Sequence, residues 1–323
     1  MRIILLCGGE GRRLWPLSHP NRTKPFIPLF EGAAGKQSTI QRIWEQLERS
    51  GLSSLVHIVI RLKQLPLLLE QLGPSVPYLI EPDGRGTYPA VVYAAACLRS
   101  KQLLGSDETL IVMPADLYVD DSFVQMLQLL EPALSKSQSQ LALIGVRPHR
   151  LTDQYGYIMP ELTASEEAGD YRSVKRFYEK PALPAASKLI EQGAYWSSGI
   201  AAFPLSLLIN KIEESGSKLD YESISAIFQE IDPSSLDCEL LEKLRHAVVL
   251  PYEGVWRDMG DWKEVAMVRT AASSEESSTH HIRLINETEI PVKIRGVANL
   301  LVVVTQEGIL IEPFHPIAAS IEE

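Results

Sequence analysis

The chain has 323 residues, of which 45% are apolar, 22% charged and 7% aromatic, as in an ordinary globular protein. This composition excludes extensive disorder and leaves room for one large domain with an appendage, or for two domains. The net charge of −10 repels nucleic acid and anionic membranes, so we expect neither as a partner. The three cysteines lie too far apart for a disulfide framework or a zinc site, and the longest apolar run, residues 90–98, is too short to span a membrane. We therefore expect a cytoplasmic protein.

Short apolar segments alternate with helical patterns along the first half of the chain. The sequence predicts buried strands at residues 3–7, 55–60, 78–80, 110–113 and 141–146. Between them it predicts helices at residues 38–49, 65–72, 89–98 and 123–130. This alternation is typical of a Rossmann-like, three-layer α/β domain with a mostly parallel mixed sheet, whose ligands bind beyond the carboxyl ends of the strands.

The second half of the chain begins with further alternating strands and helices and ends with a polar segment and short strands. The sequence predicts strands at residues 156–159, 174–178 and 200–203 and helices at residues 184–192, 205–214 and 262–271. The last helix is indicated by Asp261 and Glu264, which have N-cap and N3 spacing. Residues 272–281 are small and polar, which indicates a linker, and short strands are expected at residues 292–294, 300–304 and 309–311. We expect a domain over residues 1–271 and a small β-rich, solenoid-like element over residues 282–323.

A glycine-rich turn follows the first predicted strand, which ends near Leu6. The turn and the loop after it contain three glycines and two cationic side chains, namely Gly8, Gly9, Gly11, Arg13 and Lys24. Glycines let backbone N–H groups approach phosphate oxygens, and the cations add positive charge. The segment is neither a Walker loop nor a Rossmann fingerprint. The alternative is a plain turn before a basic surface loop, but the two cations favour phosphate binding.

Two aspartates from distant parts of the chain could bind one hard cation together. Asp116 follows a predicted strand at the edge of the sheet where ligands bind, and Asp120 or Asp121 is better placed to cap the next helix. Asp258 precedes a glycine turn. Such carboxylates can hold Mg²⁺ against phosphate oxygens. The alternatives are a helix cap for Asp116 and a turn residue for Asp258.

These segments together resemble the sugar-1-phosphate nucleotidyltransferases, and most closely the mannose-1-phosphate guanylyltransferases. The resemblance covers residues 3 to about 265 and rests on the order and spacing of GGEGRRLWPLS, TKPFIPLF, EPDGRGTYPA, MPAD, YGYI, FYEKP, WSSG, LDCELLE and WRDMGDW. It implies that residues 1–271 form a nucleotidyltransferase catalytic domain and that the β-rich tail is the C-terminal element of the family. It also implies that a sugar 1-phosphate attacks the α-phosphorus of a nucleoside triphosphate and releases pyrophosphate.

The resemblance further implies a Mg²⁺ cofactor held by Asp116 and Asp258 between the α-phosphate and the sugar phosphate. Arg13 would bind the leaving β- and γ-phosphates, and Lys24 would stabilise charge on the α-phosphate. These four residues form the expected catalytic set. No general base is needed, since the attacking phosphate is already anionic.

The same resemblance assigns residues to the two substrates. For the nucleotide they are Leu6, Gly8, Gly9, Gly11, Glu81, Gly86 and Thr87. For the sugar phosphate they are Gly156, Glu179, Lys180 and Ser198. Within these sets, Lys180 would hold the phosphate and Glu179 the sugar hydroxyls. Glu81 could accept the N1–H and N2–H of guanine together, or it could be a surface carboxylate at a strand end.

The chain departs from the family pattern at Gly86 and Ser197, where relatives usually have asparagine. Both changes remove an amide, which could relax sugar or nucleotide specificity. Our first hypothesis is GDP-mannose synthesis from GTP and mannose 1-phosphate by a homodimer. The alternatives are another NDP-sugar pyrophosphorylase, which would use glucose 1-phosphate with dTTP, UTP or ATP, and a non-catalytic subunit that senses nucleotide sugars. Retention of the four charged residues favours an enzyme.

Overall fold

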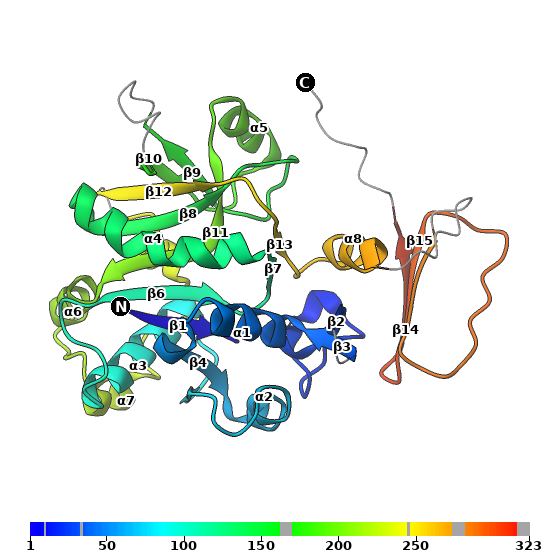
Figure 1. The fold of residues 1–323 in the computed structure, drawn as a ribbon, viewed down its shortest axis with the longest axis horizontal. Helices are drawn as coiled ribbons and strands as arrows, with labels where there is room; N and C mark the ends of the chain where they lie inside the picture. The colour runs from blue at the N-terminus through cyan, green and yellow to red at the C-terminus, as the bar shows by residue number, and fades with distance from the viewer. Residues whose placement is uncertain (10, 33–34, 162–169, 244–245, 273–281, 315–323) are drawn as a thin grey trace.

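The structure, a computed structural model, describes residues 1–9, 11–32, 35–161, 170–243, 246–272 and 282–314. A nine-stranded mixed sheet forms its centre, in the order β5-β4-β1-β6-β11-β8-β12-β10-β9 (Figure 1). Its strands are β1 (Arg2–Leu6), β4 (Val56–Arg61), β5 (Tyr78–Glu81), β6 (Thr109–Pro114), β8 (Leu141–Val146), β9 (Tyr157–Pro160), β10 (Arg172–Tyr178), β11 (Tyr195–Pro204) and β12 (Ala247–Tyr252). All run in one direction except β10 and β11. The expected mixed α/β sheet is therefore confirmed.

Helices cover both faces of this sheet and complete three layers. One face carries α1 (Thr39–Arg49), α2 (Leu65–Leu72), α4 (Asp121–Ser137) and α5 (Leu183–Glu191). The other carries α3 (Thr87–Ser100), α6 (Leu205–Glu214) and α7 (Tyr221–Ile227). Alternation along β1 divides the core in two, because Ile3 and Leu5 face the first set of helices and Ile4 the second.

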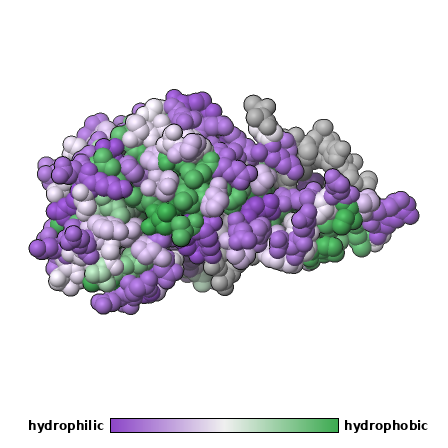
Figure 2. Space-filling model, turned by 90° about the horizontal axis from the view of Figure 1, so that it is seen from below, coloured by the Kyte–Doolittle hydropathy of each residue, from purple (hydrophilic) through white to green (hydrophobic). Residues whose placement is uncertain are grey.

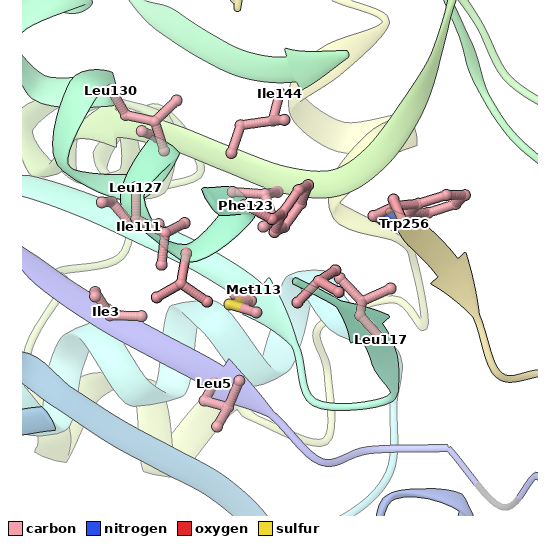
Figure 3. Close-up of a cluster of buried hydrophobic side chains, with 14 of the residues drawn as sticks. Ile3, Leu5, Ile111, Met113, Leu117, Phe123, Leu127, Leu130, Ile144 and Trp256 are labelled. Atoms are coloured by element: carbon pink, nitrogen blue, oxygen red, sulfur yellow. The ribbon is translucent and has the colours of Figure 1, made fainter. Parts of the chain in front are cut away.

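Figure 3 shows the first of these cores. Phe123 and Leu127 of α4 lie against Ile111 of β6, next to the side chains of β1. Leu117 and Trp256 extend the cluster beyond the end of β6. The apolar core therefore continues up to the edge of the sheet where the strand ends leave polar groups exposed.

Local sequence signals mark where α1 and α4 begin. Ser38 and Gln41 form a capping box at the start of α1. Asp120 caps α4, since its carboxylate accepts a hydrogen bond from the Phe123 amide at 3.0 Å. Asp116, four residues earlier, is therefore not needed as a cap, which confirms the expectation from sequence.

A three-stranded sheet forms the C-terminal element, which lies beside α8 (Trp262–Ala272) and the hairpin of β2 (Pro28–Gly32) and β3 (Gly35–Ser38) (Figure 1). In it β15 (Leu300–Val304) pairs parallel with β14 (Ile282–Asn286) and antiparallel with β16 (Ile309–Pro313). The strand expected at residues 292–294 was wrong, because that segment has no pairing partner and β14 takes its place beside β15. The linker expected at 272–281 lies almost entirely outside the described residues.

The face seen in Figure 2 is largely hydrophilic, with apolar side chains gathered near its middle and again over the C-terminal element. Two side chains of β16, Ile309 and Ile311, are well exposed. Within the described ranges, no helix combines the length and the apolar character that crossing a membrane requires.

Candidate active site

A pocket of about 370 Å³ opens beyond the carboxyl ends of β1 and β6. Its lining contains Gly8, Gly9, Gly11, Arg13, Lys24, Asp116 and Gly260. All but Gly260 were predicted from the sequence to bind phosphate or metal. The glycine turn, its two cations and the first aspartate thus lie around one cavity, at the edge of the sheet where α/β proteins bind ligands.

Lys24 lies between two carboxylates. Its Nζ is 2.6 Å from Oδ2 of Asp116 and 2.5 Å from Oδ1 of Asp258. Burial alone would lower the pKa of Lys24, but the two carboxylates outweigh it and raise the pKa above its ordinary value. The ammonium therefore stays charged at neutral pH. The two aspartates, distant in sequence, therefore lie on either side of the Lys24 ammonium; their joint binding of a metal ion stays a prediction.

A small second sheet brings these aspartates together. β7 (Leu117–Val119) begins directly after Asp116 and pairs with β13 (Trp256–Asp258), so that Asp258 stands opposite Leu117. The amide of Met259 also donates to the carbonyl of Asp116 at 3.2 Å. Each strand has three residues, too few for a periodic pattern, so the sequence did not reveal this pairing.

Two glycines lie close to the Lys24 side chain, Gly11 at its base and Gly260 at its ammonium. A Cβ on Gly260 would lie 2.9 Å from Nζ of Lys24 and 3.0 Å from Oδ1 of Asp258. A Cβ on Gly11, whose φ is +62°, would lie 2.9 Å from Cβ of Lys24. A side chain at Gly11 would be strained by its positive φ and by the Lys24 Cβ, and one at Gly260 would displace the Lys24 ammonium from its present position. Gly260 was missed, although the WRDMGDW stretch contained it.

Arg13 reaches the pocket from the exposed side of the loop. Its Nη1 donates to Oε1 of Gln154 at 3.1 Å. Gln154 belongs to the connection between β8 and β9, which also carries Gly156. This bond links the expected phosphate-binding arginine to the expected sugar side of the site. No sequence pattern marked Gln154, because its partner lies far away along the chain.

Gln64 is a second residue that sequence inspection missed. Its buried amide donates to the carbonyl of Cys7 at 3.0 Å and to the Thr23 hydroxyl at 2.7 Å. Its oxygen accepts from the Arg61 amide at 2.7 Å. Gln64 thereby joins the end of β1, the end of β4 and the segment that carries Lys24, and it holds the glycine turn in place.

Glu81 ends β5 and is almost completely buried. Burial raises the pKa of its carboxyl to about 7, against the lowering effect of Arg61 and with a further increase from Asp83. Burial also raises the pKa of the Cys7 thiol, and the charges of Asp116 and Glu81 raise it further. The carboxyls of Asp116 and Glu81 therefore lie near enough to Cys7, the residue after β1, for their charges to affect its thiol.

Gly86 and Thr87 begin α3 and contact the segment before residue 237. The φ of Gly86 is +100°, and a Cβ there would collide with the carbonyl oxygen of Ser234. Thr87 Oγ1 accepts from the Leu236 amide at 2.8 Å. The close approach of Ser234 therefore leaves no room for a side chain at position 86. The same segment leads to Asp237, whose carboxyl pKa burial and Glu179 raise to about 6.

Three of the four expected sugar-side residues lie together. A Cβ on Gly156 would lie 3.1 Å from Oε2 of Glu179, and Lys180 Nζ lies 2.6 Å from Oε1 of the same side chain. Burial would lower the pKa of Lys180, but Glu179 raises it. Ser198 is different: it is buried, and its hydroxyl accepts from the Ile200 amide at 3.2 Å. Its hydroxyl is therefore engaged by its own strand.

The chain belongs to the nucleotidyl transferase family, whose sequence model matches residues 2–275. It is similar to the xanthan biosynthesis protein XanB of Xanthomonas campestris pv. campestris (strain B100), with 29% identity over 95% of this chain and 69% of that protein. It is also similar to a mannose-1-phosphate guanylyltransferase of Escherichia coli, with 27% identity over 95% of this chain and 71% of that one. A solved structure of a mannose-1-phosphate geranyltransferase from Thermus thermophilus matches with a TM-score of 0.78 and 25% identity, covering 97% of this chain and 94% of that one. The resemblance stated from sequence is confirmed, and the chain is an enzyme of the nucleotidyltransferase class.

Proposed function

We propose that this enzyme makes GDP-mannose and pyrophosphate from GTP and mannose 1-phosphate. A phosphate oxygen of mannose 1-phosphate forms a bond to the α-phosphorus of GTP, and the bond from that phosphorus to the oxygen bridging to the β-phosphate breaks. The electron pair leaves with pyrophosphate, so no redox partner is required. The observation that carries the proposal is the convergence of Asp116, Asp258 and Lys24 beside a glycine turn.

The donor set at this point fits Mg²⁺. Asp116 and Asp258 already direct oxygens to one cationic group, the ammonium of Lys24. Mg²⁺ is commonly held by one or two carboxylates and completed by substrate phosphates and water. When bound, Mg²⁺ would neutralise charge on the phosphates.

The chain's own cations and amides would do the remaining work. Lys24 can donate to an oxygen of the α-phosphate and stabilise the charge that develops there. Arg13, at the side of the pocket, can bind the two phosphates that leave. Gly8 and Gly9 have open space above their Cα atoms, so a phosphate can approach their backbone. Positioning and charge neutralisation are what phosphoryl-type transfer demands.

Separate groups would select the sugar and the base. Lys180 and Glu179 form an ion pair at the sugar side, where the ammonium can bind the sugar phosphate and the carboxylate the hydroxyls. Glu81, in its ionised form, can accept both guanine N–H groups. The names of the relatives support mannose 1-phosphate as the substrate. The missing amides at Gly86 and Ser197 favour a second candidate, an NDP-sugar pyrophosphorylase that uses glucose 1-phosphate with another nucleotide.

Pyrophosphate release by the purified full chain tests the proposal. GTP, ATP, UTP and dTTP are each combined with mannose 1-phosphate or glucose 1-phosphate in the presence of Mg²⁺. We expect kcat/KM for GTP with mannose 1-phosphate to exceed every other pair by at least about tenfold. A faster reaction with another pair would contradict the substrate assignment. Tight binding of GDP-mannose without turnover of any pair would instead identify a sensing subunit.

A further inference from the structure

A buried carboxylate behind the site pairs with two arginines. Glu264 of α8 is 2% exposed, its Oε1 lies 3.0 Å from Arg150 Nη2, and its Oε2 lies 2.8 Å from Arg257 Nη1. Its spacing from Asp261 predicted a role in capping the helix. Asp261 accepts from the Lys263 amide at 2.8 Å, whereas each carboxylate oxygen of Glu264 accepts from an arginine. The Glu264 carboxylate therefore binds two arginines and does not act as a helix cap.

The two arginines come from different segments of the chain. Arg257 belongs to β13 and directly precedes Asp258, one of the two proposed metal ligands. Arg150 belongs to the connection between β8 and β9, which continues to Gly156 on the sugar side. One carboxylate thus joins the strand that carries Asp258 to the loop that carries the sugar-side residues.

Aromatic side chains extend this link. The Arg150 guanidinium lies 5.7 Å from the ring centroid of Tyr155 and 5.8 Å from that of Trp196. Tyr155 in turn lies edge-on against both Trp196 and Trp256, with ring centroids 5.1 Å apart in each pair. Trp256 is the first residue of β13. The same two structural units are therefore joined twice, by the carboxylate and by the rings.

The cluster lies directly against the sugar-side backbone. Tyr155 precedes Gly156, Trp196 precedes Ser197, and the Ser197 amide donates to the Gly156 carbonyl at 2.8 Å. A shift of either ring would move this backbone pair. The position of Gly156 relative to Glu179 would change with it, since these groups are in close contact.

We propose that Glu264 is a positioning residue that locks the sugar-side loop to the strand carrying Asp258, so that the sugar and diphosphate subsites form one rigid site. Glu264 touches neither substrate; it acts through Arg150 and Arg257. Without its charge, two guanidinium groups would face each other unpaired and partly buried, and they would repel each other. This inference rests on the proposed function, because it needs a sugar and a diphosphate in neighbouring subsites.

Binding of GDP and of GDP-mannose to the full chain, measured by calorimetry with EDTA present, tests the inference. The Kd of GDP divided by the Kd of GDP-mannose reports what the sugar adds to affinity. For Glu264→Gln we expect this ratio to fall at least about tenfold, while the affinity for GDP changes less than about twofold. The fluorescence change of the tryptophans on GDP-mannose binding should fall with it, because Trp196 and Trp256 belong to the cluster.

Three further variants guard against a purely structural effect. Arg150→Met keeps the Arg257–Glu264 pair and should lower the same ratio, and the double variant should lose little more than either single one. Glu253→Gln breaks the exposed pair with Arg147 and should change nothing. An unchanged ratio in Arg150→Met and in folded Glu264→Gln would overturn the inference. So would equal losses of GDP and GDP-mannose affinity accompanied by a lower Tm, because they would show general destabilisation.

The wild-type chain separates this inference from the proposed function. If wild type makes no GDP-mannose from GTP and mannose 1-phosphate, the proposed function fails and the inference fails with it. If wild type binds and makes GDP-mannose but both variants keep its ratio, the function stands and only the role of Glu264 is wrong.

Discussion

At the scale of single residues, the site is defined by opposite charges held close together in partly buried surroundings. The Lys24 side chain is only 9% exposed, while those of Asp116 and Asp258 are 26% and 31% exposed. The lysine is therefore fixed inside the wall of the pocket, and the carboxylates keep access to solvent and to a ligand. The raised pKa of Lys24 means that its contribution to stability is complete at neutral pH and is lost only in strongly alkaline solution.

The raised pKa of Glu81 has the opposite effect on stability at neutral pH, because burial of an acid favours its uncharged, protonated form. Its carboxyl titrates near pH 7 in the folded chain and near its ordinary value of 4.5 in the unfolded chain. Between these values the folded chain binds more protons than the unfolded chain. The contribution of Glu81 to the free energy of unfolding therefore falls as pH rises from 4.5 to 7.

This titration predicts a pH dependence of nucleotide binding. Only the ionised Glu81 can accept both N–H groups of guanine, so KM for GTP should fall about tenfold between about pH 6 and pH 8. Steady-state kinetics of wild type and Glu81→Gln check this. The glutamine variant should have a higher KM for GTP at the upper end of this range and lack the Glu81-dependent decrease. An identical pH profile in both proteins would show that Glu81 does not recognise the base.

At the scale of secondary-structure elements, long periodic segments were predictable and short pairings were not. The predicted limits of α2, α6 and β8 agree with the structure, because each carries a clear apolar pattern. β7 and β13 have too few residues for any pattern, yet they bring Asp116 to Asp258. Residue chemistry and family resemblance indicated the aspartates, whereas the pairing that unites them depends on the tertiary fold.

The same contrast holds for the site residues. The glycine turn, its cations and both aspartates were visible from the sequence, because their chemistry is local to short segments. Gln64, Gln154 and Glu264 were not, because each acts through partners that are distant along the chain. Sequence inspection therefore found the groups proposed to face the substrates and missed the groups that hold those in position.

The start of α3 offers a test of the steric restriction at Gly86. Gly86→Ala should destabilise the chain through both its positive φ and a collision with Ser234. Gly193→Ala is the matched control, since Gly193 has a φ of +82° and open space around its Cβ position. We expect a loss of about 1–2 kcal/mol for Gly193→Ala and at least about 1 kcal/mol more for Gly86→Ala in denaturant unfolding. Equal losses would show that Ser234 does not restrict position 86.

At the scale of the whole molecule, the C-terminal element supports the loop that follows the glycine turn. Leu301 and Val303 of β15 share a buried core with Leu14 and Leu17 of that loop. Other contacts between the two parts are the Arg22–Glu287 ion pair at 2.8 Å and a hydrogen bond from the Thr305 hydroxyl to the Pro16 carbonyl at 3.4 Å. The element is thus part of the packing that positions the pocket.

Two substitutions in the C-terminal sheet separate its inner and outer faces. Leu301→Ala removes a fully buried side chain from the shared core and should lower the free energy of unfolding by about 2–5 kcal/mol. Ile311→Ala removes an exposed side chain from the same sheet and should cost less than about 1 kcal/mol. Thermal unfolding followed by circular dichroism compares them. Equal Tm values for the two variants would mean that the element is not anchored through Leu301.

The central claim is that Asp116 and Asp258 together bind one divalent cation with the nucleotide. Mn²⁺, which shares the oxygen-ligand preference of Mg²⁺, can be titrated into the GTP-bound chain and followed by electron paramagnetic resonance. Asp116→Asn and Asp258→Asn should each weaken Mn²⁺ binding by at least about tenfold and abolish turnover while the circular dichroism spectrum is unchanged. Asp107→Asn, at an exposed turn, should bind Mn²⁺ as wild type does. Wild-type Mn²⁺ affinity in either Asp116→Asn or Asp258→Asn would contradict the shared metal site.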